Sequence, residues 1–242
     1  MNLLAFDTST DTLSIAVQHG DAVWQHTGPG GAQASATLIP TVRSLMAQAG
    51  LSFDTLEAIV FGRGPGSFTG LRTACAVAQG LAFGARGGQG VPVLPVDTLL
   101  AVAEEARHAH GCTQVVAVLD ARMDEVYVAT YRLQDQKLMA QDAPRLCRPE
   151  DLHLAVPPTA GTVLAGNAAA VYGERFDPAL RALPHVQALP TATALLRLAP
   201  EALARGLAVT SAEAQPLYVR DKVAQTTAER EAIKLAQAMG GA

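Results

Sequence analysis

The sequence contains few charged residues and few cysteines, and these shortages exclude several kinds of protein. Charged residues make up 17% of the chain and the net charge is −4, so no basic surface is predicted that would bind a nucleic acid unaided. No apolar run approaches the roughly 20 residues of a membrane-spanning helix. The amino-terminal region also lacks the basic start, apolar stretch and cleavage site of a secretory leader. We therefore expect a globular cytoplasmic protein without membrane contact.

Residue types that bind metals or form disulfides are also sparse. The three cysteines, Cys75, Cys112 and Cys147, are widely spaced and never form a Cys-x-x-Cys pair, which argues against a disulfide framework or a zinc knuckle. We interpret them as buried apolar side chains. Only His108 and His110 lie close together among the histidines, and their spacing does not place two ligands on one helix face. No metal site and no cofactor are predicted.

Apolar residues are plentiful, and their periodicity predicts an α/β fold in the first half of the chain. They form 49% of 242 residues, enough for one large domain or two of about 100 to 150 residues each. The predicted order is βββαβαβ. Its elements are strands over 3–7, 13–17 and 22–26, a helix over 35–49, a strand over 58–61, a helix over about 71–85 and a strand over 91–94.

The second half begins in the same manner, after a helix predicted over about 99–110. An apolar strand over 114–119 ends in Asp120, a turn follows, and residues 125–131 alternate back. This repeats the strand that ends in Asp7 and the hairpin after it. The repetition predicts two related lobes.

We place these lobes at residues 1–97 and 98–225. In the later part of the second lobe the patterns are weaker. They predict a strand over 163–165 and a helix over about 192–205, which Pro200 interrupts.

The remaining residues, 226–242, are predicted to form a tail helix. Thr226 and Glu229 have the spacing of a capping box, and Gly240 and Gly241 end the helix. The pattern assigns this tail no role.

A glycine-rich segment joins the strand at 58–61 to the next helix. In many phosphate-binding sites a strand is followed by a glycine-rich turn and then by the N-terminus of a helix. The segment nevertheless lacks the lysine of a Walker loop, the third glycine of a dinucleotide motif and the glycines that flank a lipase serine. Spacing alone leaves open whether it holds a ligand or only makes a tight, rigid turn. Its residues are Gly62, Arg63, Gly64, Pro65, Gly66, Ser67, Phe68, Thr69 and Gly70.

The helix after this loop is apolar on two sides. One side can pack on a sheet, and the other requires a partner protein, a second copy or, alternatively, the second lobe of the same chain as its cover. The helix over 35–49 can join it in a two-helix docking surface. The predicted interface comprises Leu38, Val42, Leu45, Arg72, Thr73, Ala76, Val77, Gly80, Phe83 and Gly84.

Several segments together closely resemble the bacterial TsaB family, also called YeaZ. The resemblance extends from about residue 2 to 223, and its glycine-loop signature is long and specific. The segments are 4–10, 62–72, 78–82, 120–127 and 214–220.

This resemblance implies an ASKHA (actin-like, Hsp70-like) fold of two ribonuclease-H-like lobes with mixed sheets. It also implies a role in forming N6-threonylcarbamoyladenosine on the tRNA adenosine immediately 3′ of the anticodon. In that family TsaB is the non-catalytic partner of its paralogue TsaD, and the P-loop ATPase TsaE joins the pair. TsaD carries a His-x-x-x-His pair on its first long helix, whereas residues 33–38 contain no histidine here.

The resemblance further places the TsaD contact on the two helices that flank the glycine loop. Isolated TsaB-like proteins can form homodimers through the same surface. Contact with tRNA is expected only through the complex. The tail helix exceeds the family pattern.

An alternative function is that of an ASKHA-type ATPase or phosphotransferase. Asp7 and Asp120 lie where such kinases hold magnesium and nucleotide phosphate, so they are candidates for a vestigial nucleotide site. The favoured interpretation is that both are turn residues that accept backbone N–H bonds, because no adenosine-binding glycine motif occurs in the second lobe. A peptidase is not supported, since metal ligands and a paired nucleophile and base are absent from the sequence.

Overall fold

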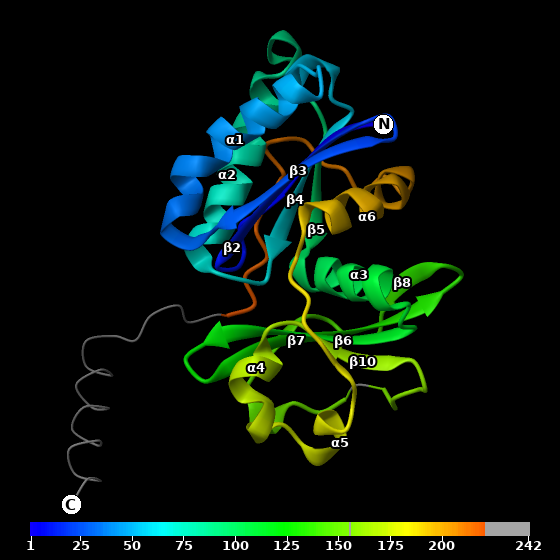
Figure 1. Ribbon diagram of the computed structural model, residues 1–242. Coiled ribbons are helices and arrows are strands. Elements are labelled where there is room, and N and C mark those ends of the chain that lie inside the picture. Colours follow the sequence, from blue (N-terminus) through cyan, green and yellow to red (C-terminus); the bar gives the residue numbers. More distant parts are fainter. Residues whose placement is uncertain (155, 221–242) are drawn as a thin grey trace, which may run out of the picture.

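The computed structural model describes residues 1–154 and 156–220, which form two lobes, each built on one mixed sheet (Figure 1). In the first sheet the strand order is β3-β2-β1-β4-β5. Strands β1 to β3 pair antiparallel, whereas β1, β4 and β5 run parallel. The bounds are Asn2–Asp7 for β1, Thr12–His19 for β2, Ala22–Pro29 for β3, Ala58–Gly64 for β4 and Val93–Asp97 for β5.

Strand β1 is central and is buried on both faces, because successive side chains of a strand point to opposite sides. Leu4 and Phe6 enter the core beneath helices α1 (Ala34–Gln48) and α2 (Phe68–Gly84). Leu3 and Ala5 enter a second core on the other face, beneath α6 (Ala192–Ala204). The predicted βββαβαβ order is confirmed.

Helix α3 (Thr98–His110) lies between the lobes and contacts both sheets. It ends at Gly111, whose φ of 66° is the left-handed conformation that favours glycine. Figure 1 shows α3 below α6 and above the second sheet.

The second sheet has the order β11-β10-β6-β7-β8, and β9 also pairs with β7. The predicted hairpin after Asp120 is present as β6 and β7. Helices α4 (Ala168–Tyr172) and α5 (Pro178–Arg181) lie beside this sheet. The strands are β6 Gln114–Arg122, β7 Glu125–Gln134, β8 Lys137–Ala140, β9 Arg145–Cys147, β10 Thr162–Ala165 and β11 His185–Val186.

Two predicted helices differ from the structure. Helix α2 begins at Phe68 rather than near residue 71, because Ser67 acts as its N-cap. Helix α6 continues through Pro200 instead of breaking there. Pro200 is exposed on the outer side of α6, and the apolar inner side holds the helix on the first sheet despite the lost backbone hydrogen bond.

The chain returns to the first lobe after crossing the second. Val209 pairs with Val93 of β5, and Ala214 enters the core beneath α2. The lobe boundary at residue 97 stays a prediction. In the structure, α6 and the segment up to residue 217 contact the first lobe, although they follow this boundary in the chain. The predicted tail helix, 226–242, lies outside the described residues. No helix within the described ranges is both long enough and apolar enough to span a membrane.

Candidate functional site

The glycine loop is packed directly against the turn that follows β1. Ser67 donates its backbone N–H to the carbonyl of Ser9 at 2.7 Å, and the Thr8 hydroxyl donates to the carbonyl of Gly70 at 2.7 Å. A Cβ atom on Gly70 would lie 1.9 Å from the Thr8 carbonyl oxygen. Close backbone approach therefore requires glycine here, which supports the interpretation of the loop as a tight, rigid turn.

The start of the loop is tied to distant parts of the chain. The Arg63 guanidinium pairs with Asp97 at 2.5 Å, and the N–H of Gly64 donates to the Thr98 hydroxyl at 3.1 Å. The N–H of Leu217 donates to the Arg63 carbonyl at 2.7 Å. These bonds join the loop to α3 and to the carboxyl-terminal part of the described chain.

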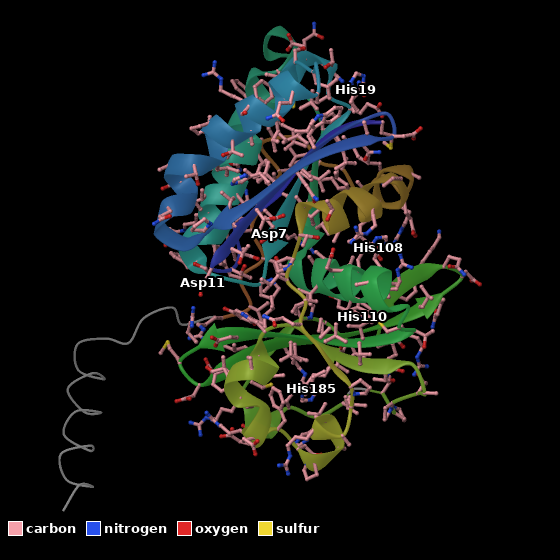
Figure 2. The ribbon with its side chains drawn as sticks, in the orientation of Figure 1. Asp7, Asp11, His19, His108, His110 and His185 are labelled. Carbon is pink, nitrogen blue, oxygen red and sulfur yellow. The ribbon has the colours of Figure 1, made fainter. Side chains whose placement is uncertain are left out.

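Asp7 is completely buried, and Figure 2 shows that it lies in the first lobe. Its Oδ1 accepts the backbone N–H of Ser9 at 2.8 Å and the Ser9 hydroxyl at 2.6 Å, while Thr98 faces Oδ2 at 3.5 Å. Burial raises the pKa of Asp7 to about 6, although these hydrogen bonds oppose the shift. Asp7 is thus an acceptor within a turn.

A cleft of about 300 Å³ separates the lobes, and the glycine loop forms part of its wall at Gly66, Ser67 and Phe68. Asp120 and Asn167 line the opposite wall, whereas Asp7 does not line the cleft. The structure therefore does not bring Asp7 and Asp120 to one cavity. Asp7 is corrected as a candidate for a nucleotide site, because its carboxylate is enclosed behind the turn.

The carboxylate of Asp120 is engaged within its own lobe. It accepts the N–H of Arg122 at 2.7 Å and the hydroxyl of Tyr172 at 3.0 Å, and its other oxygen pairs with the Arg122 guanidinium at 3.1 Å. Burial raises the pKa of Tyr172, and the hydrogen bond to the Asp120 carboxylate raises it further. Arg122 also forms an ion pair with Asp11 across the mouth of the cleft.

The two helices of the predicted interface present different residues from those expected. Leu38, Val42 and Leu45 of α1 lie in the core of the first lobe and are corrected as interface residues. They fail because the same apolar spacing that suggested a contact surface is the side of α1 that packs on the sheet. Ile39, which the prediction omitted, is 43% exposed instead.

Helix α2 carries the rest of the predicted interface on its outer side. Phe83 is 69% exposed. Thr73 and Val77 are half-buried at the edge of this side. The alternative that the second lobe covers this side is wrong, since the residues are open to solvent. We call the exposed set the docking face, and it comprises Ile39 of α1 and Arg72, Ala76, Gly80, Phe83 and Gly84 of α2.

An aromatic contact that sequence reasoning missed borders the docking face. The rings of Phe68 and Tyr218 are 5.3 Å apart, and the Arg72 guanidinium lies 3.8 Å from the centre of the Phe68 ring. Arg72 also donates to the Tyr218 hydroxyl at 3.2 Å. The only sequence signal was the motif at 214–220, which carried no predicted role.

The cysteines and histidines are dispersed. Cys75 and Cys112 are buried, as predicted, while Cys147 is half-buried, and burial raises the pKa of all three thiols. His19 and His185 lie in different lobes (Figure 2). Within the residues that the structure describes, no three His, Cys, Asp or Glu side chains are grouped so that they could hold a metal ion.

Comparison with known proteins agrees with this architecture. The model of a family described as TsaD, tRNA N6-adenosine threonylcarbamoyltransferase, matches residues 26–228. The chain is 33% identical to the Escherichia coli (strain K12) tRNA threonylcarbamoyladenosine biosynthesis protein TsaB, over 93% of this chain and 96% of that protein. The protein of the same description from Haemophilus influenzae is 31% identical over 92% of this chain and 95% of its own length.

Solved structures show the same likeness. A Pseudomonas aeruginosa protein, described as uncharacterized with similarity to peptidase YEAZ, has a TM-score of 0.82 and 38% identity. YeaZ from Pseudomonas aeruginosa has a TM-score of 0.79 and 37% identity. In both comparisons the match covers 90% of this chain and 99% of the other.

The two mixed sheets and the cleft between them define a two-lobed protein of the ASKHA, actin-like type. Within the wider family that the TsaD model describes, the chain belongs to the TsaB family, also called YeaZ.

Proposed function

We propose that this protein is a non-catalytic accessory subunit in tRNA threonylcarbamoyladenosine biosynthesis. Its relatives of known name, at 33% and 31% identity over most of the chain, are described as biosynthesis proteins of this modified nucleoside. Its partner is a TsaD-like transferase, which docks on the docking face. A TsaE-like ATPase joins them, and tRNA is reached only through the complex.

The observation that carries the proposal is the exposure of α2. Phe83 is 69% exposed and Ile39 43%, and the small residues Ala76 and Gly80 between them allow a partner to approach the helix backbone closely. Covering such a surface removes apolar area from water, worth about 25 cal/mol for each Å². A partner protein gains this free energy on docking.

The state of the two candidate carboxylates supports a non-catalytic role. Asp7 and Asp120 accept hydrogen bonds from their own turns, and only Asp120 lines the cleft. Neither is held opposite the other in the manner that a phosphotransferase would use to bind a metal and a nucleotide. This favours the accessory subunit over the ATPase alternative.

The charge distribution supports an indirect contact with tRNA, and the tRNA-modification relatives support a cytoplasmic location. The net charge is −4, and several arginines are paired with carboxylates, among them Arg63, Arg122 and Arg175. Sequence-independent binding of nucleic acid requires cations that neutralise phosphates. In the absence of the transferase, the docking face can pair with a second copy.

A mixing experiment tests the proposal. The protein and the TsaD-like enzyme of the same source should form a heterodimer at micromolar concentration, measured by light scattering after gel filtration. Gly80→Glu should abolish it, because an unpaired charge buried in an interface costs several kcal/mol. No atom lies within 4 Å of a Cβ on Gly80, so the variant remains folded.

The matched control is Val171→Glu on α4, where Val171 is 60% exposed far from the docking face. It should bind the enzyme normally. Absence of a heterodimer with the unchanged protein would contradict the proposed function. Normal binding by both Gly80→Glu and Ala76→Glu would show that the interface lies elsewhere.

A further inference from the structure

The first sheet has a long unpaired edge at β3. This strand ends the sheet and, among the described strands, pairs only with β2. The other sheet ends carry the protections that are common at edges, namely short length, lysine or a neighbouring segment. Strand β5 pairs with Val209, β11 has two residues, and β8 has four residues and carries Lys137. Strand β3 has eight residues and contains no Lys, Arg, Asp or Glu.

The register with β2 shows which backbone groups of β3 the sheet already uses. Residues 20–21 are a two-residue turn, and the pair that closes it is His19 with Ala22. In such a hairpin the closing pair exchanges both N–H···O bonds, and bonded pairs then alternate with unbonded ones. The even-numbered residues of β3 therefore bond to β2. Gly30 continues this pattern, since its N–H donates to the Asp11 carbonyl at 2.8 Å.

The odd-numbered residues of β3 direct their N–H and C=O groups away from the sheet. They are Val23, Gln25, Thr27 and Pro29. All four are exposed, and Val23 is 46% exposed. Pro29 has no N–H, and an outward position at a strand end is where a sheet tolerates proline. Val23, Gln25 and Thr27 thus present a row of backbone groups on which a further strand can form.

This row is complementary to a second copy of itself. In an antiparallel pair centred on Gln25, each Gln25 lies opposite its counterpart, and Val23 lies opposite Thr27 of the second copy. Valine and threonine are β-branched, and such side chains pair favourably across strands. Asp21, the acidic residue beside the strand, lies opposite Pro29 of the second copy, so no like charges face each other. The same edge serves both copies, as a two-fold interface requires.

We propose that two copies of this protein pair antiparallel through β3, centred on Gln25, and join their five-stranded sheets into one continuous sheet. The contact uses backbone groups of Val23, Gln25 and Thr27 and none of the docking-face residues. It therefore goes beyond the proposed function and does not depend on it.

Sedimentation of the full chain at micromolar concentration tests the pairing. The Gly80→Glu background removes any self-contact through the docking face, and this protein should be a dimer. Adding Gln25→Pro should halve its mass, because proline removes the central outward N–H without removing a bond to β2. The matched control, Gln25→Thr, keeps the N–H and should remain a dimer. A monomeric Gly80→Glu protein would overturn the proposal, as would a dimer that survives Gln25→Pro.

Cysteine crosslinking tests the register without proline. In the same background, oxidation of Gln25→Cys should give a dimer linked between the two residues 25, identified by mass spectrometry, because paired strands bring opposed residues within disulfide range. Ala22→Cys, also exposed on β3, is the control. Residue 22 lies opposite residue 28 of the second copy, about 20 Å from its own counterpart, and should not crosslink.

Equal crosslinking at positions 22 and 25 would indicate random collision and overturn the proposed register, and no crosslink at position 25 would overturn the pairing. A crosslink at position 25 in a protein that fails to bind the transferase without the Gly80→Glu change would instead refute the proposed function and leave the pairing through β3 standing.

Discussion

The carboxylate of Asp7 occupies the space in which residue 62 would carry a side chain. A Cβ atom on Gly62 would lie 1.7 Å from Oδ2 of Asp7 and 2.7 Å from its Cγ. The first glycine of the loop is therefore explained by a buried acid of the same lobe. This relationship accounts for glycine at that position without a bound phosphate.

Gly62→Ala should destabilise the protein by about 1–3 kcal/mol, because the added methyl group overpacks a fully buried site. Urea denaturation measures the free energy of unfolding. The control is Gly80→Ala, where a Cβ meets nothing within 4 Å and the higher helix propensity of alanine should stabilise α2 by up to about 1 kcal/mol. Equal effects at the two positions would contradict the close contact with Asp7.

The buried Asp7 predicts a dependence of stability on pH. Its pKa is raised from 3.8 to about 6. Between these two pH values Asp7 therefore keeps its proton in the folded state and has lost it in the unfolded state. The contribution to the free energy of unfolding is fully present below pH 3.8 and is lost as the pH rises through 6. The loss amounts to about 3 kcal/mol at 1.36 kcal/mol per pKa unit.

Asp7→Asn removes this titration. The free energy of unfolding of the variant, minus that of the unchanged protein, should increase by about 2.4 kcal/mol between pH 4 and pH 7.5. Urea denaturation at both pH values measures the difference. A difference that is constant with pH would show that Asp7 does not titrate in the raised range.

Leu38 and Phe83 should respond in opposite ways to truncation. Leu38→Ala should cost about 2–5 kcal/mol of stability, since the Leu38 side chain is fully buried in the first lobe. Phe83→Ala should change stability by less than about 0.5 kcal/mol and should weaken binding of the TsaD-like transferase. Thermal unfolding and titration calorimetry separate the two effects. A large loss of stability in Phe83→Ala would mean that α2 is covered within the monomer.

Arg220 should stabilise the turn between β6 and β7. In this turn Arg122, Met123 and Asp124 all have positive φ, between 56° and 61°, which is costly for residues other than glycine. Arg220→Ala removes the bonds to the Ala121 carbonyl and to Glu125.

The expected loss for Arg220→Ala is about 1.5–3 kcal/mol, the range for hydrogen bonds to charged groups. Faster amide hydrogen exchange in residues 121–125 would locate it. Arg43→Ala, at an exposed position on α1, serves as the control and should leave these amides unchanged. Equal exchange rates in the two variants would contradict the proposed support of the turn.

Much of the secondary structure could be predicted because its signals are local. The period-two alternation around β1 to β3 and the helix predicted over about 99–110 each depend on a short segment of sequence. The short elements β9, β11, α4 and α5 escaped prediction, since a few residues carry too little periodicity. Pro200 was misjudged because the packing of α6 outweighs its local cost.

The candidate site could be predicted only in part. The concentration of glycine indicated the loop. The exposed side of α2 followed from apolar residues on two sides of the helix, of which the sheet can cover only one. The contact of Phe68 with Tyr218 joins residues far apart in the chain, and no local pattern indicates such a pair. The same holds for the ion pair between Arg122 and Asp11.

By itself the sequence determined the βββαβαβ order, the repeated hairpin after an aspartate and the resemblance to the TsaB family. Only the tertiary structure decided which side of each helix faces water, so that Leu38 is core while Ile39 is surface. It also decided that Asp7 is enclosed whereas Asp120 lines the cleft. The physical reason is that periodicity reports which residues share a side, but burial depends on which distant segments pack against that side.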